Sequence, residues 1–292
     1  MRHPDIEEIT LPLGVMEGGE RHLTALLRPL SGREEELLAT LPVEMSVAER
    51  VTAVLARCLE RLGRAEADTD RVRRLAVGDR EALLLHLRRL TMGDRIDCVA
   101  RCSQDACGEP IDLSFRAREL LLAPYENVME WRQESVSVGD GSVSVRFRLP
   151  TGADQEAVAW LARADAASAA RQLLARCVEP VDGDDDPLEL LAEEGVAALS
   201  SRMAELDPQA ELWLRTDCPA CGSEVVSLLD AAAFLFAETA AASQQLYEEV
   251  HALAWHYHWA EGDILDLTAT RRRRYLDLIA SSLAQATREG VA

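Results

Sequence analysis

The chain has 292 residues, 48% of them hydrophobic, which is enough for two compact units with sizeable cores. Its 31 lysines and arginines face 51 aspartates and glutamates, and the resulting net charge of -20 argues against a nucleic-acid-binding protein because it repels phosphate backbones. The charged first eight residues and the absence of a long apolar run predict neither a signal peptide nor a membrane span, so we expect a cytoplasmic protein.

The first residues of the chain predict a β-hairpin. Ile9–Leu13 and Arg21–Leu30 have the composition of strands, and the glycine-containing segment Met16–Glu20 between them is typical of a turn. The hairpin is expected to open an N-terminal unit over residues 1–95.

Three helices are predicted to complete this unit, and the first two begin with capping boxes. In a capping box, serine and a glutamate three residues later each accept a hydrogen bond from the other's backbone amide. The boxes are Ser31 with Glu34, before a helix to about Thr40, and Ser46 with Glu49, before a helix to about Leu62. The third helix, about Asp79–Thr91, has leucines recurring along one face.

Two pairs of cysteines carry the strongest chemical signal. Cys218 and Cys221 are separated by two residues, Cys102 and Cys107 by four, and a glycine directly follows each pair. This spacing lets two thiolates of one tight turn bind a single tetrahedral zinc ion, and glycine tolerates the positive backbone angle that follows the second ligand. Each pair is therefore interpreted as a cysteine knuckle.

Short strands are predicted on both sides of each knuckle. Residues 96–101 and 111–115 flank the first pair, and residues 212–216 and 225–229 flank the second. Two such hairpins that hold one ion form a zinc ribbon. The predicted ribbon is split, because its halves, residues 96–116 and 210–229, are separated in the sequence.

The seven cysteines allow other arrangements. They could form two disulfides and leave three core thiols, but in a reducing compartment such clusters are more often metal sites. Cys98, four residues before Cys102, is an alternative ligand in its place. Cys58 and Cys177 lie on apolar helical stripes and are expected to be buried as small hydrophobic residues.

The 110 residues between the knuckles are too many for a loop, so an inserted unit is predicted over residues 117–209. Strands at 135–138 and 142–149, a helix from Thr151 to about Val178 and a helix over 188–206 are expected. The acidic run Asp182–Asp186 resembles a calcium loop, but Pro187 stands where that loop requires glycine. We interpret Pro187 as the first residue of the second helix.

The C-terminal segment, residues 230–292, is predicted to be helical. A helix over about 230–258 ends among His251, His256 and His258, which lack metal-binding spacing and are expected to pack and cap. The run Arg271–Arg274 cannot share one helical face. It is expected to pair with the surplus acids of the chain or, alternatively, to dock on another protein.

No catalytic motif is found in the sequence: no phosphate-binding glycine loop, no nucleophile elbow and no two-histidine metal motif. A zinc ion bound by Cys102, Cys107, Cys218 and Cys221 would have a closed shell, so we expect a structural zinc and no catalytic residues.

A likeness to known proteins is carried by the second knuckle with Leu206–Leu212 before it, by Glu249–Trp259, Asp263–Leu265 and Arg273–Leu276, by Gly78–Leu85 and by the first knuckle. These segments resemble the base-plate proteins of T-even-type contractile phages and of related contractile injection systems. This resemblance implies a hub or assembly protein of a base plate, without enzymatic activity, assembled into or onto a phage-tail-like particle. The implied partners are other base-plate, tube or spike proteins.

The expected fold is therefore α+β, mostly helical with short β-hairpins and a split zinc ribbon made of two cysteine knuckles. The expected function is a structural or assembly role in a contractile-tail base plate. Two alternatives remain: a transient assembly chaperone of the same particle, and a zinc-dependent enzyme with His251 or His256 as the fourth ligand.

Overall fold

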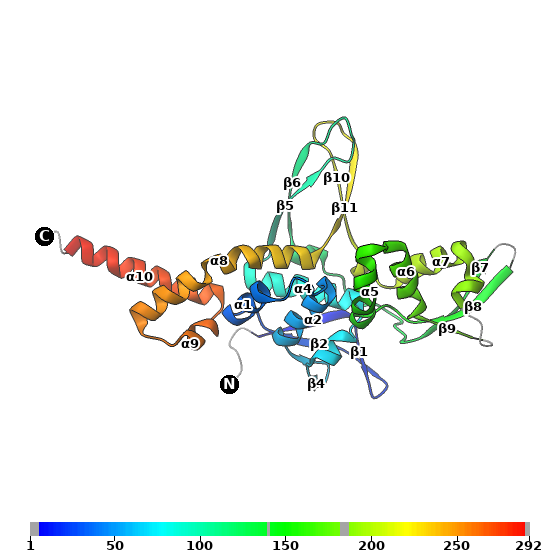
Figure 1. Cartoon of the computed structure of the whole chain (residues 1–292), viewed down its shortest axis with the longest axis horizontal. Helices are drawn as coiled ribbons and strands as arrows, with labels where there is room; N and C mark the ends of the chain where they lie inside the picture. Colours follow the sequence, from blue (N-terminus) through cyan, green and yellow to red (C-terminus); the bar gives the residue numbers. More distant parts are fainter. Residues whose placement is uncertain (1–5, 139–140, 182–186, 290–292) are drawn as a thin grey trace.

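The computed structural model describes residues 6–138, 141–181 and 187–289. The described chain is α+β, with about half of its residues in helices and the strands in short antiparallel sheets (Figure 1). Figure 1 shows a central body from which two β-hairpins project on one side and a long helix extends at one end. None of the described helices combines the length and the apolar character needed to cross a membrane.

The N-terminal sheet contains the predicted hairpin. Its antiparallel order is β1-β2-β3-β4, with bounds β1 (Glu7–Glu17), β2 (Glu20–Leu27), β3 (Leu59–Leu62) and β4 (Ala65–Glu66). The β1–β2 register shifts between Thr10 and Val15. Within this irregularity the amides of Leu13 and Gly14 donate to the buried Asp79 carboxylate, both at 2.8 Å. Asp79 therefore replaces the strand-to-strand acceptors that these two amides lack where the β1–β2 pairing is interrupted.

Four helices belong to this unit: α1 (Gly32–Thr40), α2 (Val47–Cys58), α3 (Thr69–Arg73) and α4 (Val77–Met92). Helix α4 packs against β1 and α2 against β3, whereas α1 and α3 pack against α2. Both predicted capping boxes are confirmed, Ser31 with Glu34 and Ser46 with Glu49. The prediction that α2 continues to Leu62 is wrong, because residues 59–62 form β3. Leu59 and Leu62 pair with β2 and are buried in the main core, which outweighs their helical propensity.

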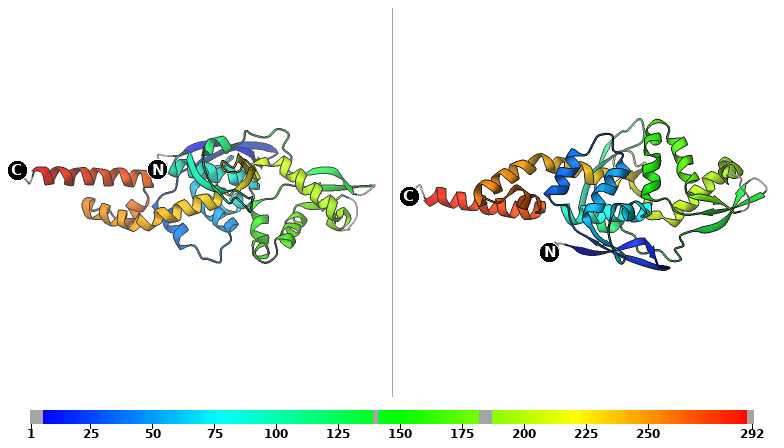
Figure 2. Two further views of the ribbon diagram at one scale, coloured as in Figure 1. Left: turned by 90° about the horizontal axis from the view of Figure 1, so that it is seen from above. Right: turned by 60° about the horizontal axis from the view of Figure 1, so that its bottom comes forward.

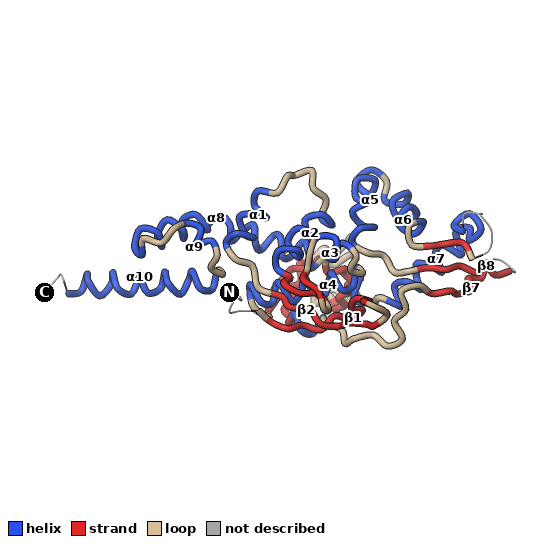
Figure 3. Tube along the Cα trace, turned by 90° about the horizontal axis from the view of Figure 1, so that it is seen from below, coloured by secondary structure: helices blue, strands red, loops and turns tan. Residues whose placement is uncertain are grey.

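The inserted segment has its own hydrophobic cluster. Figure 3 shows the strands and helices of this segment at one end of the body. It contains a three-stranded sheet, β7 (Arg132–Val138), β8 (Gly141–Phe147) and β9 (Val178–Pro180), and the helices α5 (Gly152–Ala164), α6 (Ala166–Ala175) and α7 (Pro187–Leu206). Short 3₁₀ turns, η1 (Ala117–Leu120) and η2 (Pro208–Ala210), connect it to the rest of the chain.

The single helix predicted from Thr151 to Val178 is divided in the structure. Asp165 ends α5 in an extended conformation and caps α6, where its side chain accepts a hydrogen bond from the Ser168 amide at 3.1 Å. Residues 178–180 pair with β8 instead of continuing the helix. Pro187 begins α7 as predicted, whereas the calcium-like run Asp182–Asp186 lies outside the described residues.

The two projecting hairpins form what we call the cysteine arm, residues 95–116 and 212–229. Its strands are β5 (Arg95–Arg101), β6 (Pro110–Arg116), β10 (Leu212–Asp217) and β11 (Glu224–Leu229). Each hairpin is antiparallel, and the two lie side by side with their tips together (Figure 1).

The C-terminal segment is helical, with α8 (Ala231–Tyr257), α9 (Glu261–Leu265) and α10 (Ala269–Glu289). Helix α10 extends beyond the body (Figure 2). His258 ends α8 in the left-handed conformation, with φ of 56°, and its amide donates to the Ala254 carbonyl, so the predicted capping role is confirmed for this histidine. His251 and His256 are exposed, so the prediction that they pack is wrong. Within the arginine run, Arg272 is buried and pairs with Glu35 and Glu249, whereas Arg271, Arg273 and Arg274 are exposed.

Candidate metal centre

The tips of the cysteine arm bring the two predicted knuckles face to face. Cys102 and Cys218 come directly after β5 and β10, and each begins a tight turn. The Cys102 amide donates to the Glu109 carbonyl and the Cys218 amide to the Ser223 carbonyl, both at 2.9 Å, so each turn closes immediately beyond its strands.

The glycine after each knuckle has the backbone conformation that the sequence predicted. Gly108 has φ of +60° and Gly222 has φ of +73°. A β-carbon at either position would meet nothing within 4 Å, so the requirement for glycine comes from the left-handed backbone and not from crowding.

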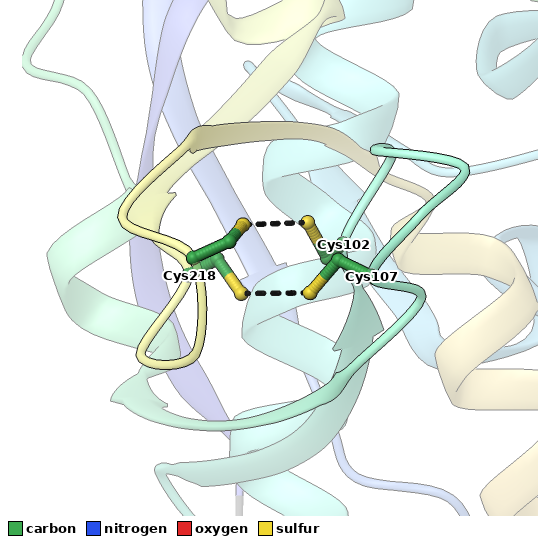
Figure 4. Close-up of side chains that lie close together, drawn as sticks. Cys102, Cys107 and Cys218 are labelled. Atoms are coloured by element: carbon green, nitrogen blue, oxygen red, sulfur yellow. Dashed lines mark hydrogen bonds between the residues drawn. The ribbon is translucent and has the colours of Figure 1, made fainter.

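The four knuckle sulfurs form one compact group (Figure 4). All lie within 4.8 Å of one another, with Cys102 Sγ 3.6 Å from Cys221 Sγ and Cys107 Sγ 3.7 Å from Cys218 Sγ. A disulfide requires about 2.05 Å, so these contacts are not disulfides. A tetrahedral ion with metal–sulfur bonds of about 2.3 Å, as in zinc–thiolate sites, places its sulfurs about 3.8 Å apart, and the observed contacts fit that spacing.

The electrostatics of the group favour a cation at its centre. Hydrogen bonds from the hydroxyl and then the amide of Ser223 lower the pKa of Cys221 to about 6. The Gln104 amide also favours the Cys102 thiolate, but desolvation and the three other thiols raise the pKa of Cys102 to about 12. Several thiolates cannot coexist at this distance without a positive charge, which a divalent ion supplies.

A small apolar cluster holds the two hairpins together beneath the sulfurs. Ile111 of β6 and Val225 of β11 are buried with Cys102 and Cys218, while Cys107 is half-buried and Cys221 is exposed. The group therefore lies at a solvent-facing end of the arm, supported from below by side chains of both hairpins.

The other cysteines lie elsewhere. Cys98 belongs to β5, opposite Leu113, and is not a member of the four-sulfur group, so the geometry does not support its use in place of Cys102. Cys58 and Cys177 are fully buried in two different hydrophobic clusters, as predicted. The predicted helical position is confirmed for Cys58 and wrong for Cys177, which lies in the turn between α6 and β9.

The histidines offered for a catalytic zinc site are far from the sulfurs. The arm joins α8 at its first residue, and His251 lies near the other end of that helix, about 30 Å away at 1.5 Å per residue. Neither His251 nor His256 belongs to the metal-ligand group found among the described residues. The structure therefore gives no support to a histidine as fourth ligand.

Sequence reasoning missed Ser223, the residue after the knuckle glycine. Its amide and hydroxyl both stabilise the Cys221 thiolate, and its carbonyl accepts from Cys218. Its position in the sequence could have identified it, because the residues that follow the second cysteine of a knuckle point their backbone amides toward the sulfurs.

A comparison with family models decides the relationship of this chain to known proteins. Residues 4–236 match the family of the T4 bacteriophage base plate protein. The chain belongs to this family. Searches of curated proteins and of solved structures gave no match.

Membership of the T4 base plate family confirms the resemblance noted in the sequence and identifies the chain as a base-plate type of protein with a structural role. It implies contacts with other base-plate components of a phage-tail particle. The family match ends within α8, so most of α8, all of α9 and all of α10 lie beyond the matched residues.

Proposed function

We propose that this chain is a non-enzymatic structural protein of the base plate of a phage-like contractile tail or injection system. In this proposal one structural zinc ion is bound by Cys102, Cys107, Cys218 and Cys221 and joins the two hairpins into a split zinc ribbon. The observation that carries it is the four-sulfur group at tetrahedral spacing in a chain of the T4 base plate family.

The zinc would make the arm rigid. Each hairpin has only two strands, and an isolated two-stranded hairpin is marginally stable in water. A closed four-thiolate shell leaves no position for substrate or water, so the ion would contribute to stability and not to catalysis. The small cluster of Ile111 and Val225 would add to this connection.

In this proposal the chain is divided into four structural units. We assign residues 1–95 to an N-terminal unit, 96–116 and 210–229 to the ribbon, 117–209 to an inserted unit and 230–292 to a C-terminal helical segment. Separate buried clusters lie in the inserted segment, in the C-terminal helices and at the arm tips. The main cluster lies mostly in the N-terminal unit but also includes Leu229 of the ribbon and Leu235 of α8, so these parts share one core. Other base-plate, tube or spike proteins are the proposed partners of their surfaces.

Purified particles provide the test. Mass spectrometry of finished particles should detect this chain with the other base-plate proteins, in a fixed ratio to them. Presence in assembly intermediates with absence from finished particles would instead identify a transient assembly chaperone. Failure to associate with either form would overturn the base-plate assignment.

A further inference from the structure

A surface groove beside the base of the cysteine arm has features of a docking site. It has a volume of about 580 Å³ and lies between the start of α2, one face of α5 and the β11–α8 junction. An occupant would therefore contact the N-terminal unit, the inserted unit and the base of the arm together.

The groove contains a carboxylate with no partner. Glu81 of α4 lines it as a half-buried residue, and no hydrogen bond or ion pair joins its carboxylate to another described residue. The neighbouring Arg80 cannot neutralise it by direct contact, because its guanidinium donates instead to Thr52 Oγ1 at 3.0 Å and to the Ala48 carbonyl at 2.8 Å. Desolvation, and then the nearby Asp230, raise the pKa of Glu81 to about 7.

A second polar group of the groove also lacks a partner. Arg50 lines the groove, and its buried Nε has no acceptor among the described residues, although its Nη2 donates to the Pro42 carbonyl at 3.2 Å. Burying an unpaired polar group costs free energy, so the buried Nε of Arg50 gains when a ligand supplies an oxygen. The half-buried Glu81 carboxylate gains an ion-pair partner when the same ligand supplies a cation.

The rim of the groove is apolar and open to solvent. Val43, Val47 and Leu228 line it, with exposed fractions of 83%, 56% and 51%. Exposed apolar residues around unpaired polar groups are typical of protein interaction surfaces.

We propose that this groove binds a segment of another base-plate protein that carries one lysine or arginine between apolar side chains. The cation pairs with Glu81, a backbone carbonyl of the segment accepts from Arg50, and the apolar side chains cover Val43, Val47 and Leu228. The choice of occupant rests on charge complementarity with the unpaired Glu81 carboxylate and on the base-plate role proposed above. Two arginines of the lining, Arg80 and Arg163, already donate to oxygens of the chain and leave this carboxylate without a partner.

The test uses overlapping 15-residue peptides that cover the other base-plate and tube proteins of the same particle. The bound peptides should contain lysine or arginine next to apolar residues. Glu81→Gln, which keeps the shape of the side chain, should weaken their binding at least ~10-fold, as should replacement of the peptide's basic residue by methionine. Val47→Ser with Leu228→Ser should also weaken binding, whereas Glu194→Gln, an exposed position on α7, should not.

Stability gives a second readout. The pKa of Glu81 is raised in the folded state, so its ionisation opposes folding as the pH rises from about 4 toward 7. Glu81→Gln should therefore raise the melting temperature at pH 8 by about 2–4 °C and change it little at pH 4. A residue that only supports the fold would lower it.

Three results would overturn the proposal: no peptide binds, binding does not depend on Glu81 or on a basic residue, or Glu81→Gln abolishes self-association of the chain, which would make a second copy the occupant. A chain that joins particles but binds none of the peptides would retain its structural role and lose the groove assignment. The two proposals therefore fail separately.

Discussion

The sulfur of Cys102 lies 3.6 Å from the sulfur of Cys221, although 119 residues separate the two cysteines. The entire inserted segment leaves and re-enters the body within the loop that this contact closes. A metal ion bound here would reduce the conformational entropy of the unfolded chain by closing this loop. It would also hold the two hairpins of the folded arm together. The arm thus joins the two hairpins that flank the inserted segment in the sequence.

Elemental analysis of the purified chain should find one zinc ion per molecule. Cys102→Ser and Cys221→Ser should each remove it during dialysis against a weak chelator, because a hydroxyl is a poor ligand for this ion and an incomplete shell binds weakly. Amide hydrogen exchange at the arm tips should then accelerate. Cys98→Ser is the matched control and should retain the metal, and loss of zinc from this variant would contradict the assignment of ligands.

Removal of the buried cation at the start of α10 should destabilise the protein. Arg272 is 2% exposed and donates to Glu35 at 2.6 Å and to Glu249 at 2.7 Å, so it connects α10 to α1 and α8. Arg272→Ala leaves two carboxylates without their shared partner and should lower the free energy of unfolding by about 3–5 kcal/mol, measured by urea denaturation. Arg274→Ala, at an exposed position, should change it by less than about 0.5 kcal/mol. Equal effects of the two substitutions would refute this role for Arg272.

Gly78 should not tolerate a side chain. A β-carbon there would lie 1.8 Å from Asp207 Oδ1, and the Gly78 amide donates to the other carboxylate oxygen at 2.8 Å. Gly78→Ala must displace the buried Asp207 and should cost about 1–3 kcal/mol in thermal or urea unfolding. Gly262→Ala, where the nearest atom is the flexible end of Arg33, serves as the control. A Gly78→Ala protein as stable as this control would show that Asp207 moves freely.

The buried Asp207 should make stability depend on pH. Burial raises its pKa to about 6, although the Gly78 amide and the Tyr125 hydroxyl donate to it. The folded state then binds more protons than the unfolded state between about pH 4 and 6, so this group's contribution is lost as the pH rises through that window.

Asp207→Asn isolates this effect, because asparagine keeps an acceptor for Gly78 and does not titrate. The stability of the wild type relative to this variant should fall by about 1–3 kcal/mol between pH 4 and pH 7, as measured by urea denaturation at each pH. A difference that stays constant or grows with pH would contradict the raised pKa of Asp207.

Local patterns account for the parts of the fold that were predicted well. Ser31 with Glu34 and Ser46 with Glu49 begin α1 and α2, and Gly108 and Gly222 adopt positive φ after their knuckles. Each of these features depends on contacts within a few residues, which the sequence contains in full.

The errors occurred where distant residues decide the conformation. Residues 59–62 continue a helical pattern, but β2 offers Leu59 and Leu62 a strand partner and a buried position. Glu81 was one of many acids in the sequence, and only the folded chain shows that it lines a groove without a partner. Arg272 was indistinguishable from its three neighbours until α1 and α8 placed Glu35 and Glu249 beside it.

The sequence by itself determined the two knuckles, the capped helices and the resemblance to base-plate proteins, because residue spacing and local hydrogen bonding carry that information. Only the tertiary structure brought the four sulfurs within 4.8 Å of one another and buried Arg272. It also left the Glu81 carboxylate unpaired. All three outcomes depend on which surfaces meet after the chain has folded.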